Sequence, residues 1–179
     1  MGHREHRLQG PASVPCAVLT VSDTRRTSTD ASGALILRSL RGAGHPVVDY
    51  RILKDEPRRI VSHLRALARR ARARVVLLSG GTGVGVRDST FEAVSGLLDK
   101  RLDGFGEIFR ALSYRTIGSA AMLSRAVAGT YRGMALFSMP GSEAAVRLAM
   151  TKLILPELPH VAGLVGKETR RSRNVHARR

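Results

Sequence analysis

The residues most suited to chemistry lie in one short segment, LLSGGTGVGVRDST, which runs from Leu77 to Thr90. It holds four glycines, and glycine weakens a helix or strand because it loses the most backbone entropy on folding. Such a cluster is typical of a loop that turns sharply or lets a ligand approach the backbone closely. The loop follows an apolar run and precedes a helical pattern, and backbone N–H groups at such a junction can hold phosphate. A plain tight turn is the alternative interpretation.

The loop matches neither of two common phosphate-binding motifs. No Lys-Ser or Lys-Thr pair follows the glycines, so it is not a Walker A loop. Gly81 and Gly83 fit the pattern G-x-G-x-x-G, but Val86 stands where the third glycine should be. Arg87, beside the loop, could neutralise a phosphate or be an ordinary surface cation.

Two carboxylates, Asp55 and Asp88, follow neighbouring predicted strands. Mg²⁺ binds one or two carboxylates together with substrate phosphates, so an ion between these aspartates would suit a phosphate pocket. Other interpretations stay open: Asp88 could be the N-cap of the next helix. Asp55 could form a turn or cap before Pro57, and Asp23 could bind a ligand or fix its own loop.

Other chemistries find little support. Cys16 is the single cysteine and begins an apolar run, so a buried thiol is favoured over a nucleophile. The six histidines show no metal-ligand spacing, and Ser113, Ser119 and Ser124 have no identifiable histidine partner for a triad. The residues alone therefore predict an enzyme or binding protein for a phosphorylated ligand, assisted by Mg²⁺.

Four short apolar runs predict the strands that position these groups: Cys16–Ser22, Pro46–Leu53, Val75–Ser79 and Met134–Met139. The second run alternates more than the others, which is typical of a strand near the edge of a sheet. Helical patterns fall between and after the strands, at residues 31–41, from 57, and at 90–98, 108–114, 119–128 and 142–155. Strands that alternate with helices predict an α/β fold, with a mostly parallel sheet and helices on both faces.

In such a sheet the carboxyl ends of the parallel strands share one edge, where ligands bind. Polar or glycine-rich residues follow all four predicted strands. These segments are Ser22-Asp23, Lys54-Asp55-Glu56, the glycine loop and Pro140-Gly141-Ser142. A single site at this edge is the strongest prediction from the residues themselves.

The 179 residues are enough for one domain with a full hydrophobic core. The apolar runs are too short to span a bilayer and the N-terminus has no apolar signal region, so we expect a cytoplasmic protein without a membrane partner. The net charge is +16, and most of it lies on the body of the chain rather than on residues 167–179. Such a body suits an anionic partner. Nucleic acid is less favoured than a phosphorylated small molecule, because no binding motif is present and only 4% of residues are aromatic.

Together the motifs resemble the MoaB/Mog family of molybdenum cofactor biosynthesis proteins. The resemblance rests on VLTVSDTR, DASG, LLSGGTGVGVRDST, GFGEIFRALSY, IGSAAMLSRAVAG and MPGS, in this order. It covers about residues 14–164 and is closer to MoaB than to Mog. It implies a three-layer α/β/α molybdopterin-binding fold, which we expect in residues 13–165. From the sequence itself we expect a flexible N-terminus (1–12) and a basic disordered tail (166–179).

The resemblance also implies a reaction. Family members bind molybdopterin, a pterin dithiolene with a terminal phosphate, and in active members this phosphate attacks the α-phosphorus of Mg-ATP. The products are adenylylated molybdopterin and pyrophosphate. The family's two important aspartates fall on Asp88 and Asp55, the expected catalytic residues and Mg²⁺ ligands. The residues expected to bind substrate or nucleotide are Ser22, Asp23, Ser79, Gly80, Gly81, Thr82, Gly83, Arg87, Ser124, Pro140, Gly141 and Ser142. A homo-oligomer, either a trimer or a hexamer built from trimers, is implied as well.

The chain departs from the family pattern at two main positions. Phe91 stands where proline is common, and proline in a first helical turn helps to set the start of the helix. Glu143 also stands where proline is common, which would place a negative charge near a predicted phosphate site. Ser79 replaces a common threonine, a milder change. Because some MoaB-type members lack the activity, a non-catalytic molybdopterin-binding protein is the alternative function, and a nucleic-acid binder is a less favoured one.

Overall fold

The computed structural model describes residues 10–85 and 88–176, the last ten of them as helical backbone alone. One sheet of six strands has the order β2-β1-β3-β6-β5-β4. The strands are β1 (Cys16–Val21), β2 (Val47–Leu53), β3 (Val75–Ser79), β4 (Lys100–Arg101), β5 (Val127–Tyr131) and β6 (Met134–Met139). The first four in this order are parallel, whereas β5 runs antiparallel to both of its neighbours. The predicted mostly parallel sheet is confirmed, and β2 lies at its edge as expected.

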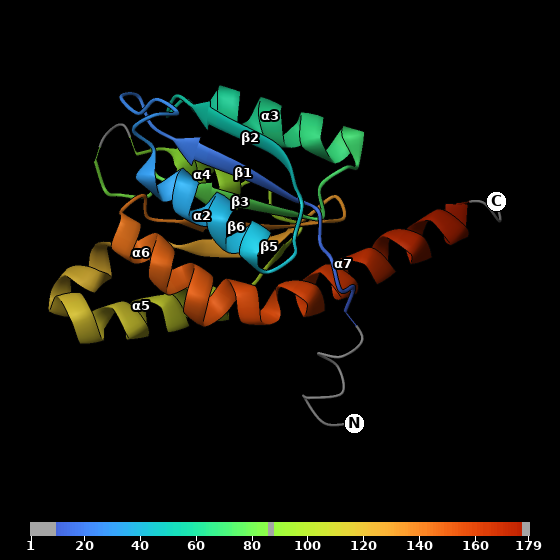
Figure 1. Cartoon of the computed structure of the whole chain (residues 1–179). Helices are drawn as coiled ribbons and strands as arrows, with labels where there is room; N and C mark the ends of the chain where they lie inside the picture. The colour runs from blue at the N-terminus through green and yellow to red at the C-terminus, as the bar shows by residue number, and fades with distance from the viewer. Residues whose placement is uncertain (1–9, 86–87, 177–179) are drawn as a thin grey trace.

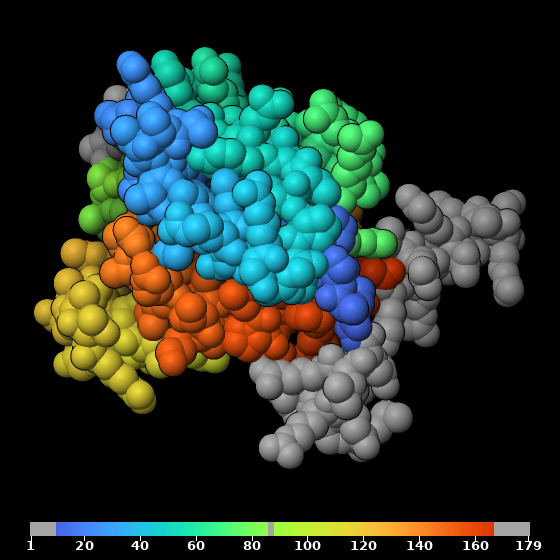
Figure 2. Space-filling view, in the orientation of Figure 1, coloured from blue at the N-terminus to red at the C-terminus, as the bar shows by residue number. Residues whose placement is uncertain are grey.

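Helices cover both faces of the sheet (Figure 1). One face carries α2 (Ala31–Gly42), α5 (Asp103–Ile117), α6 (Glu143–Leu148) and α7 (Leu155–His176), and the other carries α3 (Pro57–Arg70) and α4 (Thr90–Ser95). A 3₁₀-helix, Gly118–Leu123, follows α5, and a π-helix, Ala149–Ile154, joins α6 to α7. The space-filling view shows α2 packed beside the α6–α7 segment (Figure 2). The three-layer α/β/α fold is confirmed.

Each face of the sheet has its own apolar core. Every residue of β1, β3 and β6 is buried, because helices cover both sides of these central strands. Leu77 and Phe109 belong to the core on the side of α2 and α5, whereas Leu78 and Ile60 belong to the core beneath α3. The rigid sheet between these cores fixes where the carboxyl ends of its strands lie.

The structure corrects the prediction of a helix at residues 119–128. Helical backbone ends at Leu123, and β5 follows. β5 and β6 form a hairpin closed by Arg132 and Gly133, whose φ angles are both positive, at 45° and 81°. Two such central residues are typical of the type I′ turn, whose twist matches that of paired strands. Arg-Gly between two apolar runs was the sequence signal for this hairpin.

The last helix is also longer than predicted. The sequence predicts an end near Leu155, before Pro156, whereas helical backbone continues to His176, past residue 166 where a disordered tail is expected. Proline lacks a backbone N–H, and its ring crowds the carbonyl four residues earlier. The π-helix Ala149–Ile154 ends two residues before Pro156, and its wider turns leave more room for a proline ring than an α-helix does.

By length and composition alone, the helical stretch Glu143–Gly166 could cross a membrane, since an 18-residue window within it has a mean hydropathy of 1.2. Its apolar side faces the core, because Val146, Met150 and Leu158 are fully buried at helical spacing. α7 packs against β6. Packing on the sheet therefore accounts for the apolar residues on the buried side of this stretch.

Candidate functional site

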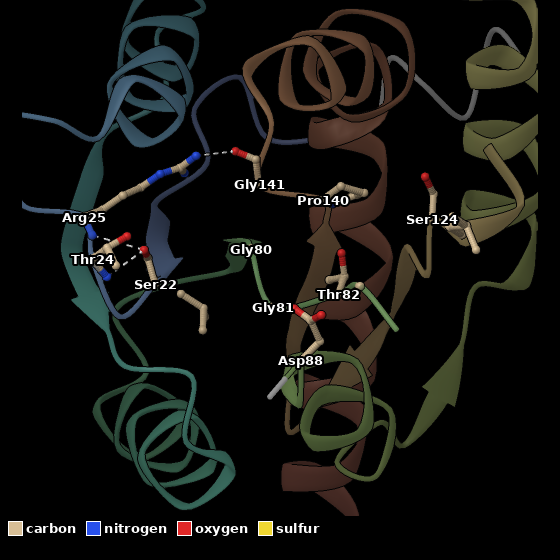
Figure 3. Close-up of a pocket in the computed structure, with 13 residues that line it drawn as sticks. Ser22, Thr24, Arg25, Gly80, Gly81, Thr82, Asp88, Ser124, Pro140 and Gly141 are labelled. Atoms are coloured by element: carbon tan, nitrogen blue, oxygen red, sulfur yellow. Dashed lines mark hydrogen bonds between the residues drawn. The ribbon is translucent and has the colours of Figure 1, made fainter. Parts of the chain in front are cut away.

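A cavity of about 420 Å³ opens at the carboxyl edge of the parallel strands, where the sequence predicts a site (Figure 3). Its walls come from the ends of β1, β3 and β6 and from the segment before β5. The lining residues are Val21, Ser22, Thr24, Arg25, Gly80, Gly81, Thr82, Gly83, Asp88, Leu123, Ser124, Pro140 and Gly141. The structure thus brings together most of the residues predicted to bind a ligand, although they come from distant parts of the sequence.

Glycines form the floor of the cavity because two backbone turns meet there. Gly80 and Gly81 have φ angles of 106° and 60°, which side-chain-bearing residues rarely adopt. The N–H of Gly80 donates to the carbonyl of Met139 at 3.1 Å, which joins the ends of β3 and β6. A Cβ on Gly141 would lie 3.0 Å from the Cα of Gly80, so neither turn has room for a side chain. The cavity is therefore lined by backbone at this point.

Part of this backbone is available to a ligand. Within the described residues, the N–H groups of Thr82 and Gly83 have no hydrogen-bond acceptor. Successive backbone N–H groups in a turn can bind an anion. The geometry favours the phosphate-binding interpretation of the glycine loop over a plain tight turn.

Asp88 lines the cavity and lies beside Gly81 and Thr82 (Figure 3). Its Oδ2 accepts a hydrogen bond from the N–H of Gly85 at 2.9 Å, and no donor for Oδ1 is found in the described part of the chain. The N-cap of α4 is Ser89, so the interpretation of Asp88 as the N-cap is wrong. One carboxylate oxygen of Asp88 thus shapes the loop, and the other can meet a ligand.

Asp55 holds the loop from outside the cavity lining. Its Oδ1 accepts hydrogen bonds from the hydroxyl of Ser89 at 2.7 Å and from the Ser89 N–H at 3.3 Å. Its own N–H donates to Oδ1 of Asp23 at 3.4 Å. The N-cap of α3 is Glu56, so the interpretation of Asp55 as that cap is not observed. Asp55 instead ties the end of β2 to the start of α4, one residue after Asp88.

The structure does not bring every predicted residue to this cavity. Ser79 is fully buried, and its hydroxyl has no partner among the described residues. Asp23 is exposed and is not among the lining residues, although its Oδ1 accepts a hydrogen bond from the N–H of Asp55. Ser142 caps α6 by accepting from the N–H of Ala145 at 3.3 Å. Arg87 lies outside the described residues.

A second cavity of about 430 Å³ adjoins the first and shares Ser124 and Pro140 with it. Its walls come from α5, α6 and the π-helix. Its lining is mainly apolar and includes Phe109, Ile117 and Leu148, with Arg147 and Lys152 as cations. An elongated ligand with one anionic and one flat apolar part could occupy both cavities.

Sequence reasoning missed Arg25, which lines the first cavity. Its Nη2 donates to the carbonyl of Gly141 at 2.8 Å, and its Nη1 lies 3.6 Å from Oδ1 of Asp30. The hydroxyl of Ser32 donates to the same Gly141 carbonyl at 2.7 Å. A cation four residues after the end of β1 was the available signal.

Asp30 is buried and anchors the wall that contains Arg25. It accepts hydrogen bonds from the Thr20 hydroxyl at 2.5 Å, the Tyr50 hydroxyl at 2.8 Å and the Gly33 N–H at 2.9 Å. Burial, together with the hydrogen bond to Asp30, raises the pKa of Tyr50 to about 12. Tyr50 therefore stays protonated and keeps donating at neutral pH, which holds Asp30 in place opposite Arg25.

Arg125, before β5, is the second missed residue. It donates to the carbonyls of Thr82 at 3.2 Å and Asp88 at 3.1 Å, and its guanidinium lies 5.0 Å from the ring centroid of Phe91.

Glu143 lines neither cavity and pairs with Arg147 at 2.7 Å. The charge of Glu143 is thus balanced on α6, away from the glycine loop.

The fold and the site define an α/β protein with a glycine-lined crevice at the carboxyl edge of its parallel strands. Residues 17–160 match the family described as "Probable molybdopterin binding domain", and the chain belongs to this family, as a relative of MoaB and Mog. The resemblance found in the sequence is confirmed, and it establishes a role in molybdenum cofactor biosynthesis.

Curated relatives cover nearly the whole chain. Molybdenum cofactor biosynthesis protein B of Halalkalibacterium halodurans is 54% identical over 162 residues, which are 90% of this chain and 95% of the relative. Its counterpart in Bacillus subtilis is 49% identical over 169 residues, 94% and 99% of the two chains.

Solved structures agree with these matches. A crystal structure of a molybdenum cofactor biosynthesis protein B has a TM-score of 0.85 at 51% identity, and the match covers 88% of this chain and 98% of that one. The tungsten cofactor synthesizing protein MoaB from Pyrococcus furiosus has a TM-score of 0.78 at 37% identity, covering 87% and 99%.

Proposed function

We propose that the chain is a molybdopterin adenylyltransferase, which joins the AMP moiety of Mg-ATP to the terminal phosphate of molybdopterin and releases pyrophosphate. The observation that carries the proposal is the first cavity, where the N–H groups of Thr82 and Gly83, which have no acceptor in the described part of the chain, lie beside the carboxylate of Asp88. Phosphoryl-type transfer depends mainly on positioning and charge neutralisation, and these groups supply both. Membership of the molybdopterin-binding family supports the choice of substrate.

The donor set fits Mg²⁺. Mg²⁺ uses one or two protein carboxylates and completes its coordination with water and substrate phosphates, so it needs no dedicated cage. Within the described residues, no group of three or more His, Cys, Asp or Glu gathers to hold a metal ion, in keeping with such a sparse site. Asp88 would hold the ion, with Asp55 as a second ligand or as the residue that orients Asp88. When bound, the ion offsets the negative charge of the ATP phosphates.

The residues of the chain orient the two substrates. The N–H groups of Thr82 and Gly83 and the cation of Arg25 would bind phosphate oxygens in the first cavity, whereas the apolar second cavity suits a flat pterin. The cavities meet at Ser124 and Pro140. There an oxygen of the molybdopterin phosphate would form a bond to the α-phosphorus of ATP as the bond to the β-phosphate breaks, with pyrophosphate leaving.

The test is pyrophosphate release from molybdopterin and Mg-ATP by the native protein and by Asp88→Asn. We expect release by the native protein and a fall of at least about 100-fold in kcat for the variant, because removal of one electrostatic stabiliser costs that much. Asp103→Asn is the matched control, since Asp103 is exposed and pairs with Arg101 away from both cavities. Full activity of Asp88→Asn would overturn the mechanism. Binding of molybdopterin without pyrophosphate release would favour the non-catalytic alternative.

A further inference from the structure

One guanidinium contacts both ends of the glycine loop. Nε of Arg125 donates to the carbonyl of Thr82 at 3.2 Å, and Nη2 donates to the carbonyls of Gly83 and Asp88, the latter at 3.1 Å. Thr82 and Gly83 lie on the β3 side of the loop, whereas Asp88 lies on the α4 side. Nη1 pairs with the carboxylate of Glu92. Arg125 therefore links the two ends of the loop, and we call its hydrogen bonds to the carbonyls of Thr82, Gly83 and Asp88 the clasp.

This arrangement requires arginine. A guanidinium offers five N–H donors in a rigid plane, so a single side chain can reach several carbonyls at fixed relative positions. A lysine ammonium is a compact, rotatable donor group without such a fork. Arg125 itself lines neither cavity, so any effect on substrate must pass through the loop and Asp88.

Phe91 supports the guanidinium from one side. The guanidinium carbon of Arg125 lies 5.0 Å from the Phe91 ring centroid, within the range of a cation–π interaction. Phe91 lies in the first turn of α4, three residues after Asp88. Phe91 is thus a contact that holds Arg125 in this chain.

We propose that Arg125 is a positioning residue that fixes the distance between the phosphate-binding backbone of the glycine loop and the carboxylate of Asp88, with Phe91 as its aromatic support. The role in turnover rests on the proposed adenylyl transfer. The effect on loop order does not, so it can be measured separately.

The kinetic test uses Arg125→Lys and Arg125→Ala, with Arg101→Lys as the matched control. Arg101 is exposed and contacts one carboxylate, that of Asp103, outside the cavities. We expect kcat to fall about 100-fold for Arg125→Ala, because a misplacement of about 1 Å can cost about 100-fold in rate. The fall should be smaller for Arg125→Lys. The KM for ATP should rise less than about threefold in both variants. Partial recovery of the alanine variant by added guanidinium ion would support positioning. A kcat within twofold of the native value for Arg125→Ala would overturn it.

The second readout is amide hydrogen exchange of residues 81–85 and 88–89 in the same variants, which needs no catalytic activity. Faster exchange in Arg125→Lys, with unchanged exchange in the strands of the sheet, is expected. Phe91→Ala should speed exchange in the same segment, and the double variant should add less than the sum of the two. Unchanged exchange in Arg125→Lys would overturn the clasp. Absence of pyrophosphate release by the native protein would overturn the proposed function alone, since the exchange experiment still decides the clasp.

Discussion

His45 shows how a single buried polar residue couples the fold to pH. It is 5% exposed, and its Nδ1 accepts a hydrogen bond from the N–H of Val14 at 3.3 Å. Burial lowers the pKa of His45 below its ordinary value of 6.5, because protonation would place a charge among apolar groups. The unfolded chain then binds a proton more readily than the folded one, so stability present above pH 6.5 is lost as the pH falls through the folded pKa.

We therefore expect the free energy of unfolding in urea to fall between pH 7.5 and pH 5, and to fall less in His45→Asn. Asparagine keeps an oxygen that can accept from Val14 but does not titrate. His160→Asn is the matched control, because His160 is near the surface and pairs with Glu157 on α7. An equal fall in the native protein and in His45→Asn would contradict this origin.

At the scale of an element, α2 depends on the absence of a side chain at Gly33. A Cβ there would lie 2.8 Å from Cγ of Asp30 and 2.9 Å from the hydroxyl oxygen of Thr20. It would displace the buried carboxylate that caps the helix and faces Arg25. Gly42, the last residue of the same helix, has nothing within 4 Å of a built Cβ.

Replacement of these two glycines by alanine should therefore affect the free energy of unfolding differently. Gly33→Ala should lower the free energy of unfolding by about 1–3 kcal/mol, as overpacking of a core does. Gly42→Ala should leave it unchanged or raise it by up to about 1 kcal/mol, because alanine favours helix. Urea unfolding of both variants measures this, and a destabilised Gly42→Ala or a stabilised Gly33→Ala would be the contrary result.

Local patterns in the sequence correctly predicted the strands that are buried on both faces of the sheet. The runs at β1, β3 and β6 are apolar throughout because both of their faces are covered, and the glycines follow β3 where its backbone lies against Gly141. β5 was missed because the turn that pairs it with β6 is Arg132-Gly133, a weaker hairpin signal than Asn-Gly or Asp-Gly. The apolar stretch before it reads equally well as helix.

The site was predictable in its location and less so in its contacts. Parallel strands bring their ends to one edge by topology alone, which is why Ser22, Gly80 and Gly141 could be placed together. The inward direction of the Ser79 side chain and the reach of Arg125 across the loop depend on tertiary packing. Neither feature can be predicted from the spacing of residues in the sequence.

At the scale of the whole molecule, one part of the surface is unusually apolar. Five side chains of α5 and the 3₁₀-helix are between 51% and 76% exposed: Ile108, Tyr114, Ile117, Met122 and Leu123. The yellow segment that carries them forms a projecting corner of the molecule (Figure 2). Large apolar groups gathered on a surface are typical of an interface.

We expect a homo-oligomer, a trimer or a hexamer, with a second copy covering this corner. Met122→Glu should shift the sedimentation coefficient toward the monomer, because it would bury an unpaired charge at the contact. Val48→Glu, an exposed apolar residue on β2 at the edge of the sheet, is the control and should leave assembly unchanged. Oligomers that persist in Met122→Glu would place the contact elsewhere.

The β5–β6 hairpin has a consequence for how this protein can change over evolutionary time. Val127 pairs with Ser138, so Arg125 and Pro140, two residues beyond each, leave the hairpin at the same end. The turn at Arg132 and Gly133 is at the opposite end. Insertions or substitutions in that turn could therefore accumulate without changing the position of Arg125 relative to Pro140 at the cavity.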